Sequence, residues 1–143
     1  MRVMVLVKAS EHFEGGELPT EEELAEMVHF NEELAEAGVL LDKEGLHPSA
    51  RGKRVWCAGD ERTVINGPFP GTRELVAGFW IWQVRSLEEA VEWLRRAPLD
   101  RTEVELRPLL EAEDLGAALT PELHAREEHL QTRMEWLRRG APR

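Results

Sequence analysis

Cysteine is scarce in this sequence, and its shortage excludes several kinds of site. The single cysteine, Cys57, cannot form a disulfide within the chain, and no neighbouring group of Cys and His residues is spaced to bind zinc. We therefore expect no metal and no cofactor. Cys57 lies in the strand-like stretch VWCA, which predicts a small buried apolar side chain rather than a reactive thiol.

Long apolar runs are also missing. No stretch approaches the roughly 18–20 residues that cross a bilayer. The apolar run at the N-terminus covers only residues 3–7 before Lys8, which is too short for the core of a signal peptide. We expect a cytoplasmic protein with no membrane partner.

Positive charge is in short supply, because 18 Lys and Arg face 28 Asp and Glu and leave a net charge of −10. Proteins that bind nucleic acid neutralise phosphates with Lys and Arg, so we expect no nucleic-acid partner. The two local basic stretches, residues 51–54 and 95–96, are predicted to be a solvated loop and a helix end. The length of 143 residues, 42% of them hydrophobic, suits a globular domain with a real core.

Strand-like and helix-like stretches follow the order β-α-β-hairpin-β-α-β. Helices are predicted over about 21–37, after a capping box of Thr20 and Glu23, and between a second such box at Ser86 and the break at Pro98. The loop-like segment 11–19 joins the first strand to the first helix. Strands are predicted at residues 3–7, 39–48, 53–59, 62–65, 75–84 and 103–110.

Each helix has apolar residues at a spacing of three to four. The C-terminal extension, residues 111–143, contains a further helix that begins after Thr120 and must bury its stripe against the body or a second subunit. The predicted stripes are Leu24, Met27, Val28, Leu34 and Ala35; then Leu87, Ala90, Val91 and Leu94; and in the extension Leu123, Leu130, Met134 and Leu137.

Two β-α-β units with helices on one face of a largely antiparallel sheet predict an α+β, ferredoxin-like domain over residues 1–110. The stretch FWIW at 79–82 places large side chains on both faces of its strand. Since no helix remains for the second face, we expect two sheets to pack face to face in a homodimer.

The stretch TVINGPFPGT, residues 63–72, allows more than one interpretation. A phosphate loop is excluded because Pro68 and Pro70 lack N–H donors and a strand follows instead of a helix. Two interpretations stay open. The stretch is a stiff connector between strands with Phe69 packed into the body, or it is a pocket rim where Phe69 and the Asn66 amide face a ligand.

Other polar residues are candidates for a ligand or catalytic site. His47 lies beside Pro48 near a strand end and is a candidate acid or base, although a surface loop histidine is the more common explanation for such a residue. Lys8 and Arg107 can hold a small acid or serve as ordinary edge charges. His124 and His129 point about 140° apart on a helix, so we predict no metal site there.

The middle of the chain resembles the YCII-related family, in its DGPF-domain branch. The resemblance covers residues 1 to about 110, and its motifs occur in the same order as in the family. They are Glu44-Gly45-Leu46 with Pro48, Asn66-Gly67-Pro68-Phe69, Arg73-Glu74, Gly78-Phe79, Ser86-Leu87, Glu88 to Trp93, and Glu105-Leu106-Arg107-Pro108.

The resemblance implies a dimeric α+β barrel of two ferredoxin-like subunits. Relatives in this family are mostly unassigned, some look like small enzymes of aromatic or lactone metabolism, and DGPF members are associated with sigma factors of the extracytoplasmic-function type. This chain departs from the family pattern in two places. The motif Asp is Asn66, which cannot act as a general base, and His29 and Asp100 lie outside the local pattern of the proposed catalytic His-Asp pair.

Three functional hypotheses follow. The first is a homodimeric module that binds a small organic ligand or regulates a partner, with Lys8, His47, Asn66, Phe69 and Arg107 as ligand-binding candidates. The second is a small lyase or isomerase that acts on a compact organic acid, with His47, His29 or Asp100 as catalytic candidates. The third is a structural oligomer with the C-terminal helix as an assembly arm. We favour the first because the sequence shows no convincing acid–base pair.

Overall fold

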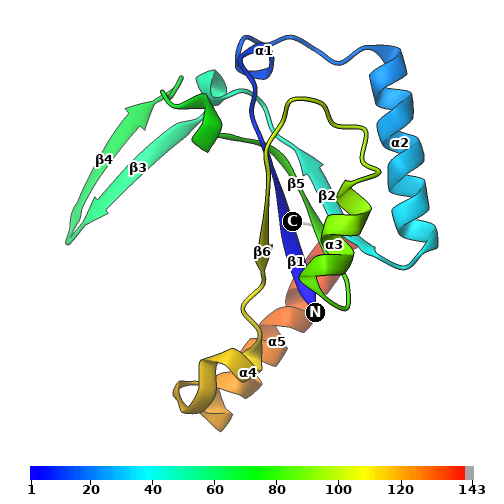
Figure 1. The fold of residues 1–143 in the computed structure, drawn as a ribbon. Coiled ribbons are helices and arrows are strands. Elements are labelled where there is room, and N and C mark those ends of the chain that lie inside the picture. The colour runs from blue at the N-terminus through cyan, green and yellow to red at the C-terminus, as the bar shows by residue number, and fades with distance from the viewer. Residues whose placement is uncertain (141–143) are drawn as a thin grey trace. The chain divides into compact units, whose positions relative to one another are not determined.

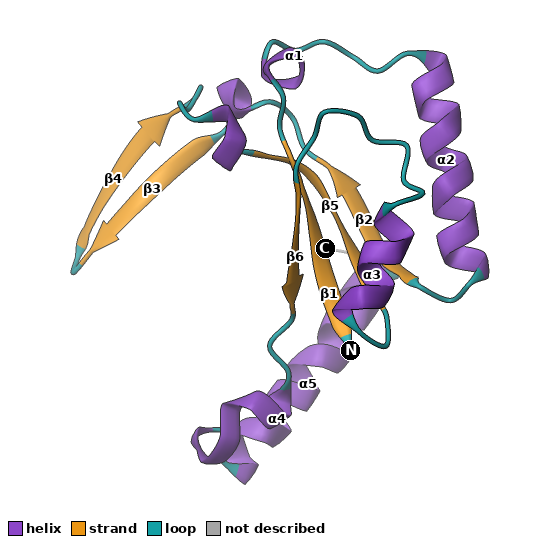
Figure 2. Ribbon diagram, in the orientation of Figure 1, coloured by secondary structure: helices purple, strands orange, loops and turns teal. Residues whose placement is uncertain are grey.

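The computed structural model describes residues 1–140 and contains two compact units, Met1–Leu109 and a second that begins at Leu110. Each unit is described by itself, and Figures 1 and 2 show their elements. The first unit contains β1 (Arg2–Lys8), α1 (Glu11–Glu14), α2 (Glu21–Glu36), β2 (Leu40–Gly45), β3 (Lys53–Ala58), β4 (Glu61–Asn66), β5 (Val76–Gln83), α3 (Leu87–Leu94) and β6 (Val104–Pro108), with short 3-10 turns η1 (Ser49–Arg51) and η2 (Thr72–Glu74).

The main sheet confirms the predicted α+β class. Within residues 1–140 its strand order is β2-β5-β1-β6, and every neighbouring pair is antiparallel. Strand β5 lies between β1 and β2, and β1 lies between β5 and β6, which is the arrangement of two split β-α-β units. The hairpin β3–β4 is a separate two-stranded sheet inserted between β2 and β5.

Helices α2 and α3 cover one face of the main sheet (Figure 1). The register places Val3 opposite Trp82 and Val5 opposite Trp80, and these four side chains are buried beneath the helices. Phe30 of α2 meets both tryptophans edge-on, with ring centroids 5.9 Å and 6.4 Å apart. Such aromatic pairs stabilise a core beyond their apolar area.

The predicted stripe of α2 is partly wrong. Its centre is Phe30 and Leu34, with Met27 packed beside them, whereas Leu24 and Val28 expose 52% and 56% of their surface. The helix itself was predicted correctly, because Thr20 caps Glu23 N and Gly38 at φ 75° follows the last turn. Spacing alone could not show which of two neighbouring apolar rows faces the sheet.

The prediction that Cys57 is buried is also wrong, since its side chain is exposed. All residues of β3 and β4 are exposed because the hairpin pairs only with itself and lies away from the main core. Alternating apolar residues predict a strand, but they do not show whether anything covers that strand.

Residues 11–14 form the short helix α1 instead of the expected loop. The Ser10 side chain accepts a hydrogen bond from Phe13 N and so starts the turn. The second unit contains α4 (Ala112–Leu115) and α5 (Pro121–Arg138), and Thr120 caps α5 as predicted. Residues 141–143 of the predicted extension lie outside the described residues.

Two features are absent from the described residues, 1–140. No helix among them is long and apolar enough to cross a membrane. No group of three or more His, Cys, Asp or Glu side chains in that part of the chain is arranged to hold a metal ion.

Candidate functional site

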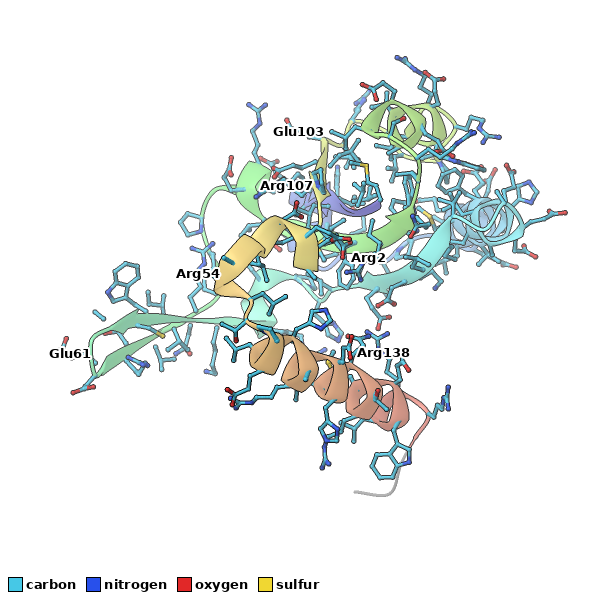
Figure 3. All side chains as sticks on the ribbon, turned by 90° about the horizontal axis from the view of Figure 1, so that it is seen from below. Arg2, Arg54, Glu61, Glu103, Arg107 and Arg138 are labelled. Atoms are coloured by element: carbon cyan, nitrogen blue, oxygen red, sulfur yellow. The ribbon has the colours of Figure 1, made fainter. Side chains whose placement is uncertain are left out.

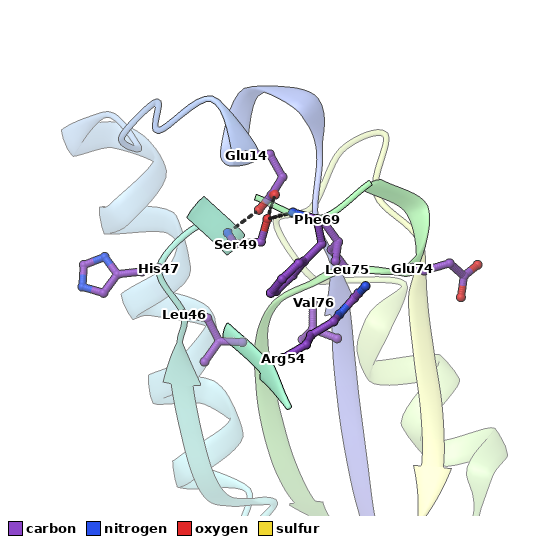
Figure 4. Close-up of a pocket in the computed structure, with 9 residues that line it drawn as sticks. All are labelled: Glu14, Leu46, His47, Ser49, Arg54, Phe69, Glu74, Leu75 and Val76. Atoms are coloured by element: carbon purple, nitrogen blue, oxygen red, sulfur yellow. Dashed lines mark hydrogen bonds between the residues drawn. The ribbon is translucent and has the colours of Figure 1, made fainter. Parts of the chain in front are cut away.

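A pocket opens in the first unit where α1, η1, the base of the hairpin and the start of β5 meet (Figure 4). Its volume is about 300 Å³, which is at the small end of the range for ligand pockets. The residues that line it are Glu14, Leu46, His47, Ser49, Arg54, Phe69, Glu74, Leu75 and Val76.

Ser49 joins three segments that are distant in the sequence. Its N–H donates to Glu14 Oε2 over 2.9 Å, and its hydroxyl donates to Glu14 Oε1. The same hydroxyl oxygen accepts a hydrogen bond from Phe69 N over 3.0 Å. Hydrogen bonds to a charged carboxylate are among the stronger ones in proteins, so this contact fixes α1, η1 and the loop of Phe69 around the pocket.

Gly67 allows the loop to approach η1 closely. A Cβ atom on Gly67 would lie 1.7 Å from the carbonyl oxygen of Ser49. Any residue other than glycine would therefore overlap with the backbone at this position. The Gly67 N–H donates to Gly52 O over 3.0 Å, and the Gly67–Pro68 peptide bond is cis. The motif Asn66-Gly67-Pro68-Phe69 is therefore a connector that also presents Phe69 to the pocket, whereas Asn66 does not line the pocket, so the rim interpretation applies only to Phe69.

Arg54 provides the positive charge of the pocket. Its guanidinium carbon lies 4.1 Å from the centroid of the Phe69 ring, and Figure 4 shows the two side chains together. Among residues 1–140 no carboxylate forms an ion pair with Arg54, and no hydrogen bond holds its guanidinium group. The stacked group thus keeps all its N–H donors available above the ring.

The remaining walls are apolar at the base and acidic at the edge. Leu75 is buried, and Val76 is half-buried beside it at the start of β5. Leu46 faces them from the end of β2, while Glu74 points outward at the rim (Figure 4). A compact apolar body with one anionic group matches this combination of walls.

His47 lies at the edge of the same pocket, but its ring points away from Phe69 in Figure 4. Its nitrogens Nδ1 and Nε2 lie 3.2 Å and 3.0 Å from Nη1 of Arg51. The structure therefore places His47 beside the pocket with its ring outside it.

Lys8 and Arg107 lie together, but on the sheet face opposite α2 and α3 and not in the pocket. Glu105 lies between them, with 3.4 Å to Lys8 Nζ and 3.1 Å to Arg107 Nη1. The Arg107 hydrogen bond, and then that of Lys8, lowers the pKa of Glu105 below its usual range. Glu105 therefore forms ion pairs with Lys8 on the neighbouring strand β1 and with Arg107 on its own strand β6.

The other candidates are scattered. His29 on α2 is exposed, with Nε2 2.9 Å from Glu33 Oε1, and exposed Asp100 lies 3.8 Å from its neighbour Arg101. Asn66 ends β4 and accepts a hydrogen bond from Lys53 Nζ over 2.6 Å. None of these three candidates is among the described residues that line the pocket.

The sequence analysis missed Glu14, Ser49 and Arg54. Arg54 belongs to the basic stretch at 51–54, which was interpreted as a solvated loop. Its stacking on Phe69 joins residues on either side of a hairpin and leaves no local pattern. The strand predicted at 53–59 contains Arg54, as β3 does, but a strand pattern gives no sign of a contact with Phe69.

Comparison with known proteins supplies a family and a distant likeness of structure. The family model described as "YCII-related domain" matches residues 1–113. No curated protein matches the sequence. Among solved structures, 5-chloro-2-hydroxyhydroquinone dehydrochlorinase from Burkholderia phenoliruptrix, in complex with 2,5-dihydroxybenzoquinone, aligns with a TM-score of 0.41 and 13% identity over 79% of this chain and 97% of that chain.

Proposed function

The chain belongs to the YCII-related domain family, and we propose that it is a homodimeric module that binds a compact organic acid at the pocket of Arg54 and Phe69. The observation that carries the proposal is the guanidinium group of Arg54, which lies over an aromatic ring beside an apolar wall and has no carboxylate partner among the described residues. A carboxylate ligand supplies that partner.

The chemistry of the pocket selects the class of ligand. A guanidinium group binds a carboxylate through two parallel N–H donors, and its other plane stays stacked on the Phe69 ring. Glu14 is occupied by Ser49, so it repels an anion less than a free carboxylate would. Leu46, Leu75 and Val76 favour an apolar remainder on the ligand.

The homodimer is proposed from the face of the main sheet that lies opposite α2 and α3. Met4 lies opposite Ile81 and Leu6 opposite Phe79, so these four apolar side chains share that face. Helices α2 and α3 pack on the other face. Sheet-on-sheet packing of two copies would remove this apolar surface from water.

We also assign the chain to the DGPF branch of the family, with Asn66 in place of the motif Asp. The support is the role of the motif here: Gly67 makes the close approach to Ser49, and Asn66 only accepts a hydrogen bond from Lys53. An Asp would accept the same bond, so the replacement leaves the loop intact and removes a possible base.

Titration with benzoate, followed by NMR chemical shifts or calorimetry, tests ligand binding. We expect benzoate to bind, its neutral isostere benzamide to bind about tenfold or more weakly, and Arg54→Leu to lose a similar factor, because a charge-assisted hydrogen bond contributes about 1.5–3 kcal/mol. Arg95→Leu is the matched control, since Arg95 is the C-cap residue of α3 and pairs with Glu92. Equal binding of benzoate by wild type and Arg54→Leu would contradict the proposal.

A small lyase or isomerase is the second candidate function. The observation in its favour is that His47 borders the pocket, and histidine is the side chain that most often acts as a general acid or base. Turnover by this route requires the ring to rotate inward from Arg51. A rate that is unchanged in His47→Gln at every pH would exclude His47 as the base.

A further inference from the structure

The hairpin of β3 and β4, residues 53–66, is an exposed arm. None of its residues is buried in the described structure, and Trp56 and Val64 expose 67% and 57% of their surface. Figure 3 shows Glu61 at the tip of the arm, far from the main sheet. An isolated two-stranded hairpin is marginally stable in water, so this arm gains from a surface that covers it.

One face of the arm combines an apolar centre with two cations. Val55 pairs with Val64, and Cys57 pairs with Arg62, so their side chains share a face. Lys53 lies on this face two residues before Val55. At about 3.3 Å per residue, the two cationic ends of this face lie about 13 Å apart.

The charges on this face argue against the packing of two arms on each other. Lys53 donates to Asn66 Oδ1, and Arg62 donates to the carbonyl oxygens of Gly59 and Glu61. Among residues 1–140 neither forms an ion pair with a carboxylate. Two such faces in contact would oppose like charges, which is unfavourable, so the arm requires an acidic partner surface.

Helix α2 presents such a surface. All its Asp, Glu, Lys and Arg positions are glutamates, and Leu24 and Val28 are exposed one turn apart. At 100° per residue, Glu21 and Glu32 lie beside these two apolar residues on the solvent side, about 16 Å apart along the axis. Neither glutamate forms an ion pair among the described residues. We call Glu21, Leu24, Val28 and Glu32 the α2 ridge.

The two surfaces match in the spacing of their charges, with Val55 and Val64 side by side across the arm and Leu24 and Val28 one turn apart along α2. Each has two apolar side chains between two charges, and the charges have opposite sign. The difference between about 13 Å and about 16 Å is within reach of long Lys, Arg and Glu side chains. The arm projects from the main sheet away from α2 (Figure 1), so one copy cannot make this contact with itself.

We propose that the hairpin arm of one copy docks on the α2 ridge of a second copy, with Val55 and Val64 against Leu24 and Val28. Lys53 and Arg62 then face Glu21 and Glu32 across the contact. The contact uses neither the sheet face opposite α2 and α3 nor the pocket. It is therefore an association step separate from the sheet-to-sheet dimer. A reciprocal pair of such contacts closes a two-fold dimer, and a one-way contact builds larger assemblies.

Charge reversal tests this contact on the full chain. Analytical ultracentrifugation over a range of protein concentrations and at two salt concentrations measures the association. We expect Lys53→Glu with Arg62→Glu, and separately Glu21→Lys with Glu32→Lys, to weaken it by about tenfold or more, because like charges then oppose each other. All four substitutions in one chain restore the opposite signs and should restore association.

A mixture of the two double variants is a second test that needs no further substitution. In the mixture each arm again meets a ridge of opposite charge, so the mixed sample should associate more strongly than either variant alone. Circular dichroism confirms that each variant is folded. Double variants that associate as strongly as wild type, or a fourfold variant and a mixture without recovery, would overturn the proposal.

Discussion

Among the described glycines, Gly67 is the position where an added Cβ atom would lie closest to its surroundings. A Cβ atom there would meet the backbone carbonyl of Ser49 at 1.7 Å, and backbone cannot move aside as a flexible side chain can. We expect Gly67→Ala to lower the free energy of unfolding by more than about 2 kcal/mol, as steric overlaps in tight backbone contacts do. Urea denaturation measures the loss.

Gly45→Ala is the matched control for this prediction. A Cβ atom on Gly45 has no neighbour within 4 Å among the described residues, and its backbone is not left-handed. Its effect should stay within about 0.5 kcal/mol. Equal losses for the two variants would show that the contact with Ser49 is not the cause.

The protonation of Glu105 makes the stability of the fold depend on pH. Its pKa lies below the ordinary value of 4.5 because Arg107 and Lys8 donate hydrogen bonds to the carboxylate. The folded state therefore binds this proton less readily than the unfolded state, so the contribution is complete above pH 4.5 and is lost as pH falls through the lowered pKa.

Glu105→Gln removes this dependence. The melting temperature of wild type should fall more steeply than that of the variant between pH 5 and about pH 3, and the two curves should converge at the acid end. Melting curves at several pH values, with Glu36→Gln on α2 as a surface control, give the answer. Parallel curves for wild type and Glu105→Gln would rule out the effect.

Among the elements, α2 is the one whose stability depends most clearly on the hydrogen bond that caps its first turn. Thr20 Oγ1 accepts a hydrogen bond from Glu23 N over 3.1 Å, and Phe30 and Leu34 of the same helix are buried in the core. We expect Thr20→Ala to cost about 1 kcal/mol of unfolding free energy, the usual effect of a lost N-cap. Thermal or urea unfolding measures it.

Thr20→Ser is the control, because a serine hydroxyl accepts the same hydrogen bond and ranks as high at the N-cap. Its stability should stay close to that of wild type. If serine destabilises as much as alanine, the Thr20 methyl group and not the cap explains the loss.

For the whole molecule, the sheet face opposite α2 and α3 decides the oligomeric state that we propose. Leu6 lies near the centre of that face, opposite Phe79 and Glu105. Leu6→Asp places an unpaired charge in the sheet-to-sheet contact, so we expect the dimer mass to fall to that of one chain. Light scattering measures the mass, and Leu18→Asp in an exposed loop is the control. A Leu6→Asp chain that stays folded and dimeric would contradict the proposed dimer.

Local chemistry allowed much of the fold to be predicted from the sequence. The caps at Thr20, Ser86 and Thr120 act within three residues, and the structure contains all three. Short apolar runs at β1 and β5 predicted both strands, and the order of the elements along the chain indicated the α+β class. The candidate site was recovered only in part, since Phe69 and His47 line the pocket and the other ligand-binding candidates do not.

Sequence alone determined the main strands and the three long helices, although not the short helix α1, because caps, breakers and apolar periodicity act over a few neighbouring residues. Tertiary structure decided the site, because its contacts join distant residues: Ser49 reaches Glu14 across 35 positions, and Arg54 stacks on Phe69. It also decided which apolar residues stay in water, since Cys57 and Val28 resemble core residues in sequence and are exposed. Burial depends on whether another surface lies opposite, and only the folded arrangement of the chain supplies or withholds that surface.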